Sequence, residues 1–157
     1  MNYKNIIQLF ERKNLYLFLI KFCIGICLFI IIDKFLFLQF VSKYFTKMTK
    51  NIRLRKHYLI IPIIFIYIIL FASLYYFILK DININIQFNN TIYKKVFKII
   101  LNAFILGFSI YSIYELTNYA LFKNWTLYMV LLDSLWGGTL FSIVTFLYLC
   151  ISQLLKV

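Results

Sequence analysis

The stretch YSIYELTNYALFKNWTLYMVLLDSLWGG, residues 111–138, decides the fold predicted for this chain. Two apolar runs meet here at the short polar connection FKNWT, which predicts a tight antiparallel helical hairpin. Yet Glu115, Asn118 and Asp133 lie in or at the edge of these runs. Because a carboxylate at the centre of a membrane helix costs about 2.5–3.5 kcal/mol, these side chains are expected to face the protein interior.

The composition of the whole chain is that of a membrane protein. Its apolar fraction is 64% and its mean hydropathy is +0.87, whereas soluble domains have about 45–50% apolar residues. The net charge is +12, from 17 basic and 5 acidic residues. The basic residues bracket the apolar runs, which favours anionic lipid headgroups as partners over nucleic acid. The predicted partner is therefore the lipid bilayer.

Four apolar segments are each long enough to cross a bilayer as a helix, which takes about 20 residues. They cover roughly residues 15–40, 58–79, 96–122 and 127–155. The sequence thus predicts an all-α, multi-pass integral membrane protein, a single transmembrane domain over residues 1–157 with the up-down topology of a four-helix bundle. The connection over residues 43–57 is predicted to face headgroups, and that over residues 80–95 to be an interfacial loop. Basic residues are balanced on the two sides, so the positive-inside rule gives no orientation.

Helical spacing gathers the polar residues of the last two segments into stripes. One face of the third segment carries a glycine, two phenols, a carboxyl and an amide, from Gly107, Tyr111, Tyr114, Glu115 and Asn118. On the fourth segment, Asp133, Trp136 and Gly137 share a face. The glycines permit close helix contact, and the Trp136 indole can donate to a carboxylate.

The topology predicts one polar layer. Glu115 and Asp133 flank the hairpin turn at similar distances along the sequence, so they lie at similar depth, and Asp33 near the end of the first segment falls on the same side of an up-down bundle. All three carboxyls can therefore approach one another. Trp125, in the turn, is interpreted as an interfacial anchor.

The sequence offers little for metal or cofactor chemistry. Cys23 and Cys27 share a helix face but have no further ligands nearby, and with Cys150 they are interpreted as packing residues. No P-loop, dinucleotide fingerprint, HExxH, GxSxG or zinc cluster is present in the sequence. We predict neither a cofactor nor a metal.

The last third of the chain resembles a family of small predicted integral membrane proteins of unknown function. The hallmark of the family is Y-D-x-T-N, then W-P, then D-x-x-W-G. Here these read Tyr114-Glu115-Leu116-Thr117-Asn118, Trp125-Thr126 and Asp133-Ser134-Leu135-Trp136-Gly137. Asp33 matches the aspartate that ends the first helix of the family, while Pro62 and Tyr67 match a Pro and a Tyr opening the second. Glu115 replaces the usual Asp and Thr126 the usual Pro. The resemblance implies four transmembrane helices and no established activity.

The leading hypothesis is a membrane protein that binds a small molecule or lipid at its polar layer, or an enzyme on a membrane-dissolved substrate. Glu115 and Asp133 are the candidate catalytic acid and base, and the candidate ligand-binding residues are Asp33, Tyr111, Tyr114, Asn118 and Trp136. Two alternatives stay open: a proton-coupled carrier acting as a homo-oligomer, and a structural membrane protein whose carboxyls are interhelical glue.

Overall fold

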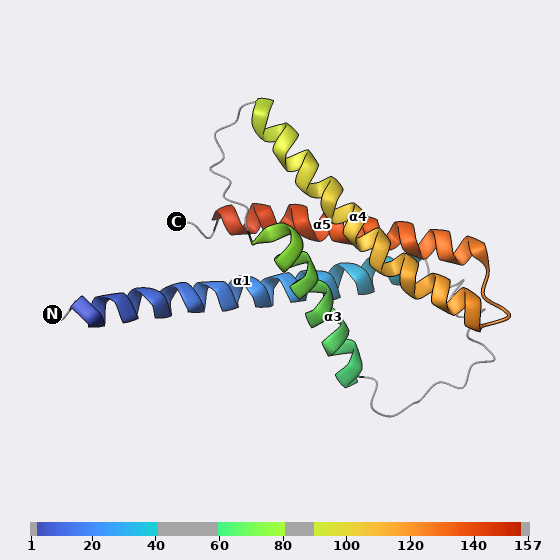
Figure 1. The fold of residues 1–157 in the computed structure, drawn as a ribbon, viewed down its shortest axis with the longest axis horizontal. Helices are drawn as coiled ribbons and strands as arrows, with labels where there is room; N and C mark the ends of the chain where they lie inside the picture. Colours follow the sequence, from blue (N-terminus) through green and yellow to red (C-terminus); the bar gives the residue numbers. More distant parts are fainter. Residues whose placement is uncertain (1–2, 41–59, 81–89, 155–157) are drawn as a thin grey trace.

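Long helices make up the described part of the chain, which in this computed structural model comprises residues 3–40, 60–80 and 90–154 (Figure 1). The helices are α1 (Tyr3–Phe40), α3 (Ile60–Leu74) with its continuation η1 (Tyr75–Leu79), α4 (Asn90–Leu121) and α5 (Leu127–Leu154). No strand occurs within these described ranges. Helices satisfy all their backbone hydrogen bonds internally, which is what long apolar segments require in a bilayer. The predicted all-α class is therefore confirmed.

Four of these helical segments are long and apolar enough to cross a membrane: Leu15–Phe35, Ile61–Leu79, Tyr93–Leu121 and Leu127–Gln153. The shortest, with 19 residues, extends about 28 Å at a rise of 1.5 Å per residue, close to the roughly 30 Å of a hydrocarbon core.

Two connections were predicted as loops. The segment 43–57 lies outside the described residues, as do residues 81–89 of the predicted interfacial loop. The rest of that loop differs from the prediction, because α4 begins at Asn90. A helix can continue past the apolar core with its backbone still hydrogen-bonded, and the exposed Lys94 and Lys95 lie on this extension.

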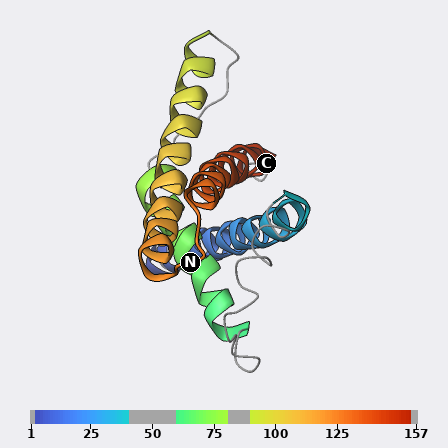
Figure 2. The ribbon, with the colours of Figure 1, turned by 90° about the vertical axis from the view of Figure 1, so that its right-hand side faces the viewer.

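Helix α5 is the centre of the molecule. In an apolar stretch of 18 residues within its span, 44% of the residues are buried inside the protein, against 11–22% in the corresponding stretches of the other three spans. Figure 1 shows α1 and α5 running side by side in opposite directions, with α3 and α4 crossing them, and the end-on view in Figure 2 agrees. Because the axes of α3 and α4 cross those of α1 and α5 instead of lying parallel to them, the up-down order of the spans stays a prediction.

An aromatic core joins α1, α3 and α5. Phe29, Phe71 and Phe141 are fully buried. The ring of Phe29 meets that of Phe141 edge-on at a centroid distance of 4.9 Å, and that of Phe71 at 6.2 Å. Gly25 of α1 faces the Phe71 ring so closely that a Cβ there would collide with it. The lack of a side chain at this position therefore brings α1 and α3 together.

Helices α4 and α5 approach each other through glycines. A Cβ on Gly107 would strike the backbone oxygen of Gly137, and a Cβ on Gly137 would strike the Tyr111 ring. Further along the hairpin, the Ser142 hydroxyl donates to the backbone oxygen of Ile100 at 3.3 Å. Contacting residues therefore have rising numbers in α5 where they have falling numbers in α4. The two helices are thus antiparallel. This close packing fixes the polar residues of α4 against those of α5.

Helix α3 ends in a short π-helical segment. In η1 the Lys80 N–H donates to the backbone oxygen of Tyr75, five residues earlier, at 2.9 Å. The wider turn leaves Leu79 buried, while the Lys80 ammonium lies 3.8 Å from the centre of the Tyr76 ring. This cation–π contact holds the charge at the end of the span.

Candidate ligand-binding site

Asp33 ties three helices together. Its Oδ2 accepts a hydrogen bond from the Tyr67 hydroxyl of α3 at 2.7 Å, and its Oδ1 accepts one from the Trp136 indole N–H of α5 at 2.9 Å. The carboxyl is half-buried, whereas the neighbouring Lys34 is exposed. Both carboxylate oxygens therefore have donors, and the charge is accommodated by side chains from other helices.

Glu115 belongs to a second cluster, at the hairpin end of α4. It is fully buried, and its Oε2 accepts the Trp125 indole N–H at 2.6 Å. Backbone hydrogen bonds in the turn between α4 and α5 place Trp125 here. The Phe122 N–H donates to the backbone oxygen of Asn118, and the backbone N–H of Trp125 donates to the backbone oxygen of Phe122. Trp125 is only 5% exposed. It is thus a buried partner of Glu115 and not the interfacial anchor that the sequence suggested.

Asp133 of α5 lies beside Glu115. The two carboxyl groups are close enough to interact electrostatically, and the Asn118 side chain lies near Glu115. Asp133 and Asn118 are 4% and 8% exposed. The predicted proximity of these groups therefore holds in the structure.

Three buried polar atoms of this cluster lack a hydrogen-bond partner within the described part of the chain: Glu115 Oε1, Asn118 Nδ2 and Asp133 Oδ1. Two ionised carboxylates offer only acceptors to each other, so a bond between them requires a proton on one of them. The cluster therefore has unused hydrogen-bonding capacity. Each unpaired buried polar group costs about 1–3 kcal/mol, so a ligand that supplied the missing partners would be stabilised.

Tyr111 connects the two clusters. It lies one helical turn before Glu115 and is close to Asp33, Asp133 and Tyr67. Asp133 likewise interacts with Asp33 as well as with Glu115. The three carboxyls thus contribute to one polar region built from all four helices.

A cavity of about 350 Å³ opens beside Asp133, between α3, α4 and α5. It is lined by Ile66, Leu70, Ile110, Tyr111, Tyr114 and Asp133. Tyr114 is 56% exposed and Ile66 53% exposed, so this side of the cavity faces outward, within the membrane-spanning length of α3 and α4. Asp133 supplies a carboxyl at the inner wall.

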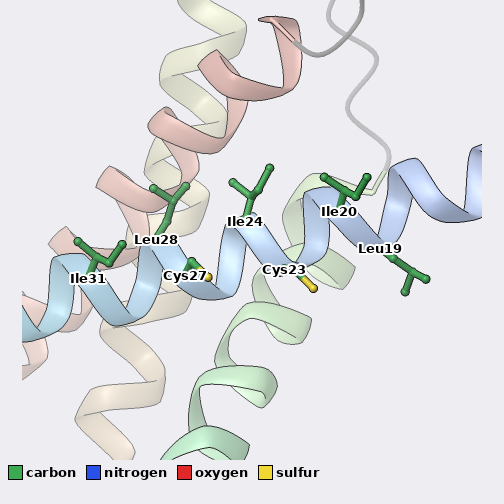
Figure 3. Close-up of a pocket in the computed structure, with 7 residues that line it drawn as sticks. All are labelled: Leu19, Ile20, Cys23, Ile24, Cys27, Leu28 and Ile31. Carbon is green, nitrogen blue, oxygen red and sulfur yellow. The ribbon is translucent and has the colours of Figure 1, made fainter.

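A second hollow on the surface has different chemistry. It measures about 440 Å³ and runs along α1 between Leu19 and Ile31 (Figure 3). Figure 3 shows its lining side chains following one face of α1, with Cys23 and Cys27 among them. Both thiols are exposed, although the sequence suggested packing. With apolar and sulfur-bearing side chains only, this groove fits the surface that a helix presents to lipid tails.

The described side chains contain no group of three or more His, Cys, Asp or Glu residues that could hold a metal ion. The groups that the polar layer presents for binding a ligand are carboxyl, phenol, amide and indole groups.

The site residues proposed from the sequence are all placed by the structure. Asp133, Tyr111 and Tyr114 line the cavity, Glu115 and Asn118 lie behind Asp133, and Asp33 with Trp136 form the adjoining cluster. Sequence reasoning missed two contributors, Tyr67 and Trp125. Both had been matched to family positions, but neither had been assigned to the polar layer.

Comparison with known proteins agrees with this architecture. The family model DUF2177, described as "Predicted membrane protein", matches residues 18–150. The chain belongs to this family. The match confirms the resemblance to predicted membrane proteins of unknown function, and it covers every polar residue discussed above. Together with the four apolar helices, it identifies a multi-pass integral membrane protein. No curated protein and no solved structure matches the chain.

Proposed function

We propose that this protein binds a small amphipathic molecule or lipid in the cavity beside Asp133. The observation that carries the proposal is a buried carboxyl oxygen, Asp133 Oδ1, without a hydrogen-bond partner in the described chain, on a residue lining a cavity of about 350 Å³. Ligand pockets have volumes of about 300–1,000 Å³ and combine apolar walls with a few polar groups. Intramembrane carboxyls that are not neutralised by a neighbour are typical of functional sites.

The exposure of the cavity supports a ligand that arrives from the bilayer. Tyr114 and Ile66 are more than half exposed within the spans, where the surroundings are lipid. An apolar body would pack along Ile66, Leu70 and Ile110, while a polar head would reach Asp133.

An enzymatic extension of this proposal uses Glu115 and Asp133 together. Two neighbouring carboxyl groups can hold and pass a proton, one acting as acid and the other as base. Asn118 and Tyr111 would orient the substrate.

A structural role is favoured for one part of the layer only. Asp33 has both oxygens hydrogen-bonded by side chains of α3 and α5, as expected of interhelical glue. Asp133 differs, because one of its oxygens has no such partner in the described residues.

The test is native mass spectrometry with lipidomics on the purified protein, comparing wild type with Asp133→Asn. The matched control is Thr139→Val, since the Thr139 hydroxyl is exposed and bonds only to Leu135 of its own helix. A molecule retained by wild type and Thr139→Val and absent from Asp133→Asn supports the proposal. Equal, nonspecific lipid in all three proteins would contradict it.

A further inference from the structure

The chemistry of the cavity wall restricts the ligand further. Among the described residues that line it, Asp133 alone is acidic or basic, and the others are Ile66, Leu70, Ile110, Tyr111 and Tyr114. None of these described lining residues is a cation that could meet a phosphate or carboxylate head beside Asp133, and like charges in a low-dielectric site repel strongly.

The groups behind the wall are hydrogen-bond acceptors as well. The main electrostatic partners of Asp133 are Glu115 and Asp33, both acidic. Asp33 already accepts from Tyr67 and Trp136, and one oxygen of Glu115 accepts from Trp125. The atoms of this cluster left without a partner in the described chain are two acceptors, Asp133 Oδ1 and Glu115 Oε1, against one donor, Asn118 Nδ2. Such a set calls for a donor, and best for a donor with positive charge.

Aromatic rings complete the arrangement. Tyr111 and Tyr114 of α4 both line the cavity. Tyr111 lies one helical turn before Glu115, and Tyr114 directly precedes it in the sequence. The face of a phenol ring attracts a cation, more strongly when water is excluded. Carboxylate and phenol groups around one cavity are thus suited to an ammonium group.

We propose that the ligand is a membrane-soluble amine, with its ammonium group donating to Asp133 and its hydrocarbon body along Ile66, Leu70 and Ile110. This inference rests on the proposed ligand-binding function and names its substrate class. The amine enters from the lipid side, past Tyr114 and Ile66. Glu115 lies next to Asp133 and is not among the described residues that line the cavity.

The experiment uses probes that share one hydrocarbon chain and differ in the head: dodecylamine, dodecanol and dodecanoic acid. Binding to the full chain in lipid nanodiscs is measured by titration with native mass spectrometry, with empty nanodiscs as the blank for partitioning. We expect dodecylamine to saturate at one molecule per chain and to bind at least about tenfold more tightly than the other two probes.

Two variants locate the binding. Asp133→Asn, which keeps the side-chain shape, is expected to weaken dodecylamine at least about tenfold. Ile66→Trp narrows the cavity from its exposed side and leaves the carboxyl groups unchanged. It is expected to weaken the binding of dodecylamine as well. Thr139→Val is expected to bind like wild type, and far-ultraviolet circular dichroism verifies that each variant is folded.

The outcomes separate the two proposals. If dodecanol or dodecanoic acid binds as tightly as dodecylamine and requires Asp133, the amine inference fails and the ligand-binding function stands. If dodecylamine binding is saturable but unchanged in both Asp133→Asn and Ile66→Trp, the amine inference also fails. If no probe saturates above the blank and wild type retains no molecule during purification, the proposed function fails with it.

Discussion

Replacing Tyr67 by Phe tests whether Asp33 holds the helices together. The change removes one hydroxyl and keeps the buried ring, so the 2.7 Å hydrogen bond to Asp33 is lost while packing is preserved. Interhelical hydrogen bonds in membrane proteins contribute about 0.6 kcal/mol on average. Charge-assisted bonds are roughly twice as strong as neutral ones. We therefore expect Tyr67→Phe to lower the free energy of unfolding by about 1.2 kcal/mol.

A double-mutant cycle with Trp136→Phe extends the test. Trp136 donates to the other oxygen of Asp33, so each single variant leaves one donor and the double variant leaves none from this pair. The half-buried carboxyl then loses both bonds, and the combined destabilisation should exceed the sum of the two single effects by about 0.5 kcal/mol or more.

The assay is reversible unfolding in mixed micelles, followed by far-ultraviolet circular dichroism as the denaturing detergent is increased. Tyr119→Phe, which removes an exposed phenol from α4, is the matched control. A Tyr67→Phe variant as stable as this control, within about 0.3 kcal/mol, would refute the role of Asp33 as a bonded junction. Strict additivity in the cycle would show that the two donors act independently.

Three other substitutions have defined outcomes in the same unfolding assay. Gly137→Val drives a side chain into the Tyr111 ring and should cost about 1–3 kcal/mol by separating α4 from α5; a stability equal to wild type would contradict the close approach. Trp125→Phe leaves Glu115 without its indole donor and should cost about 1–3 kcal/mol, whereas an interfacial anchor would lose far less. Cys27→Ala changes an exposed position in the α1 groove and should stay within about 0.5 kcal/mol of wild type; a larger loss would mean that the thiol is packed.

The helices and the polar face of α4 were accessible from the sequence because both depend on local periodicity. Long uncharged runs require helices in a bilayer, and residues three and four apart share a helix face. The stripe that includes Glu115 and Asn118 is buried against α5, while Tyr114 at its edge is exposed. The sequence thus predicted the burial of Glu115 and Asn118 but not the exposure of Tyr114.

The partners across helices were less accessible. Periodicity assigns a side chain to a face but does not say which helix lies opposite, and that choice depends on how the helices cross. Trp136 was expected to donate to a carboxylate, and its partner is Asp33 of α1, not Asp133 of its own helix. Trp125 was assigned to the interface because tryptophans are common there, but the tight turn folds its ring back onto Glu115.

The central claim is that a molecule dissolved in the bilayer binds beside Asp133. Photo-crosslinking with a diazirine-bearing long-chain amine, followed by peptide mapping, tests this most directly, because it distinguishes the cavity beside Asp133 from the hollow along α1. We predict labelling between residues 66 and 70 of α3 and between residues 110 and 114 of α4, competed by dodecylamine and lost in Asp133→Asn. Labelling confined to the α1 groove around Cys23, or uniform along every span, would contradict the account.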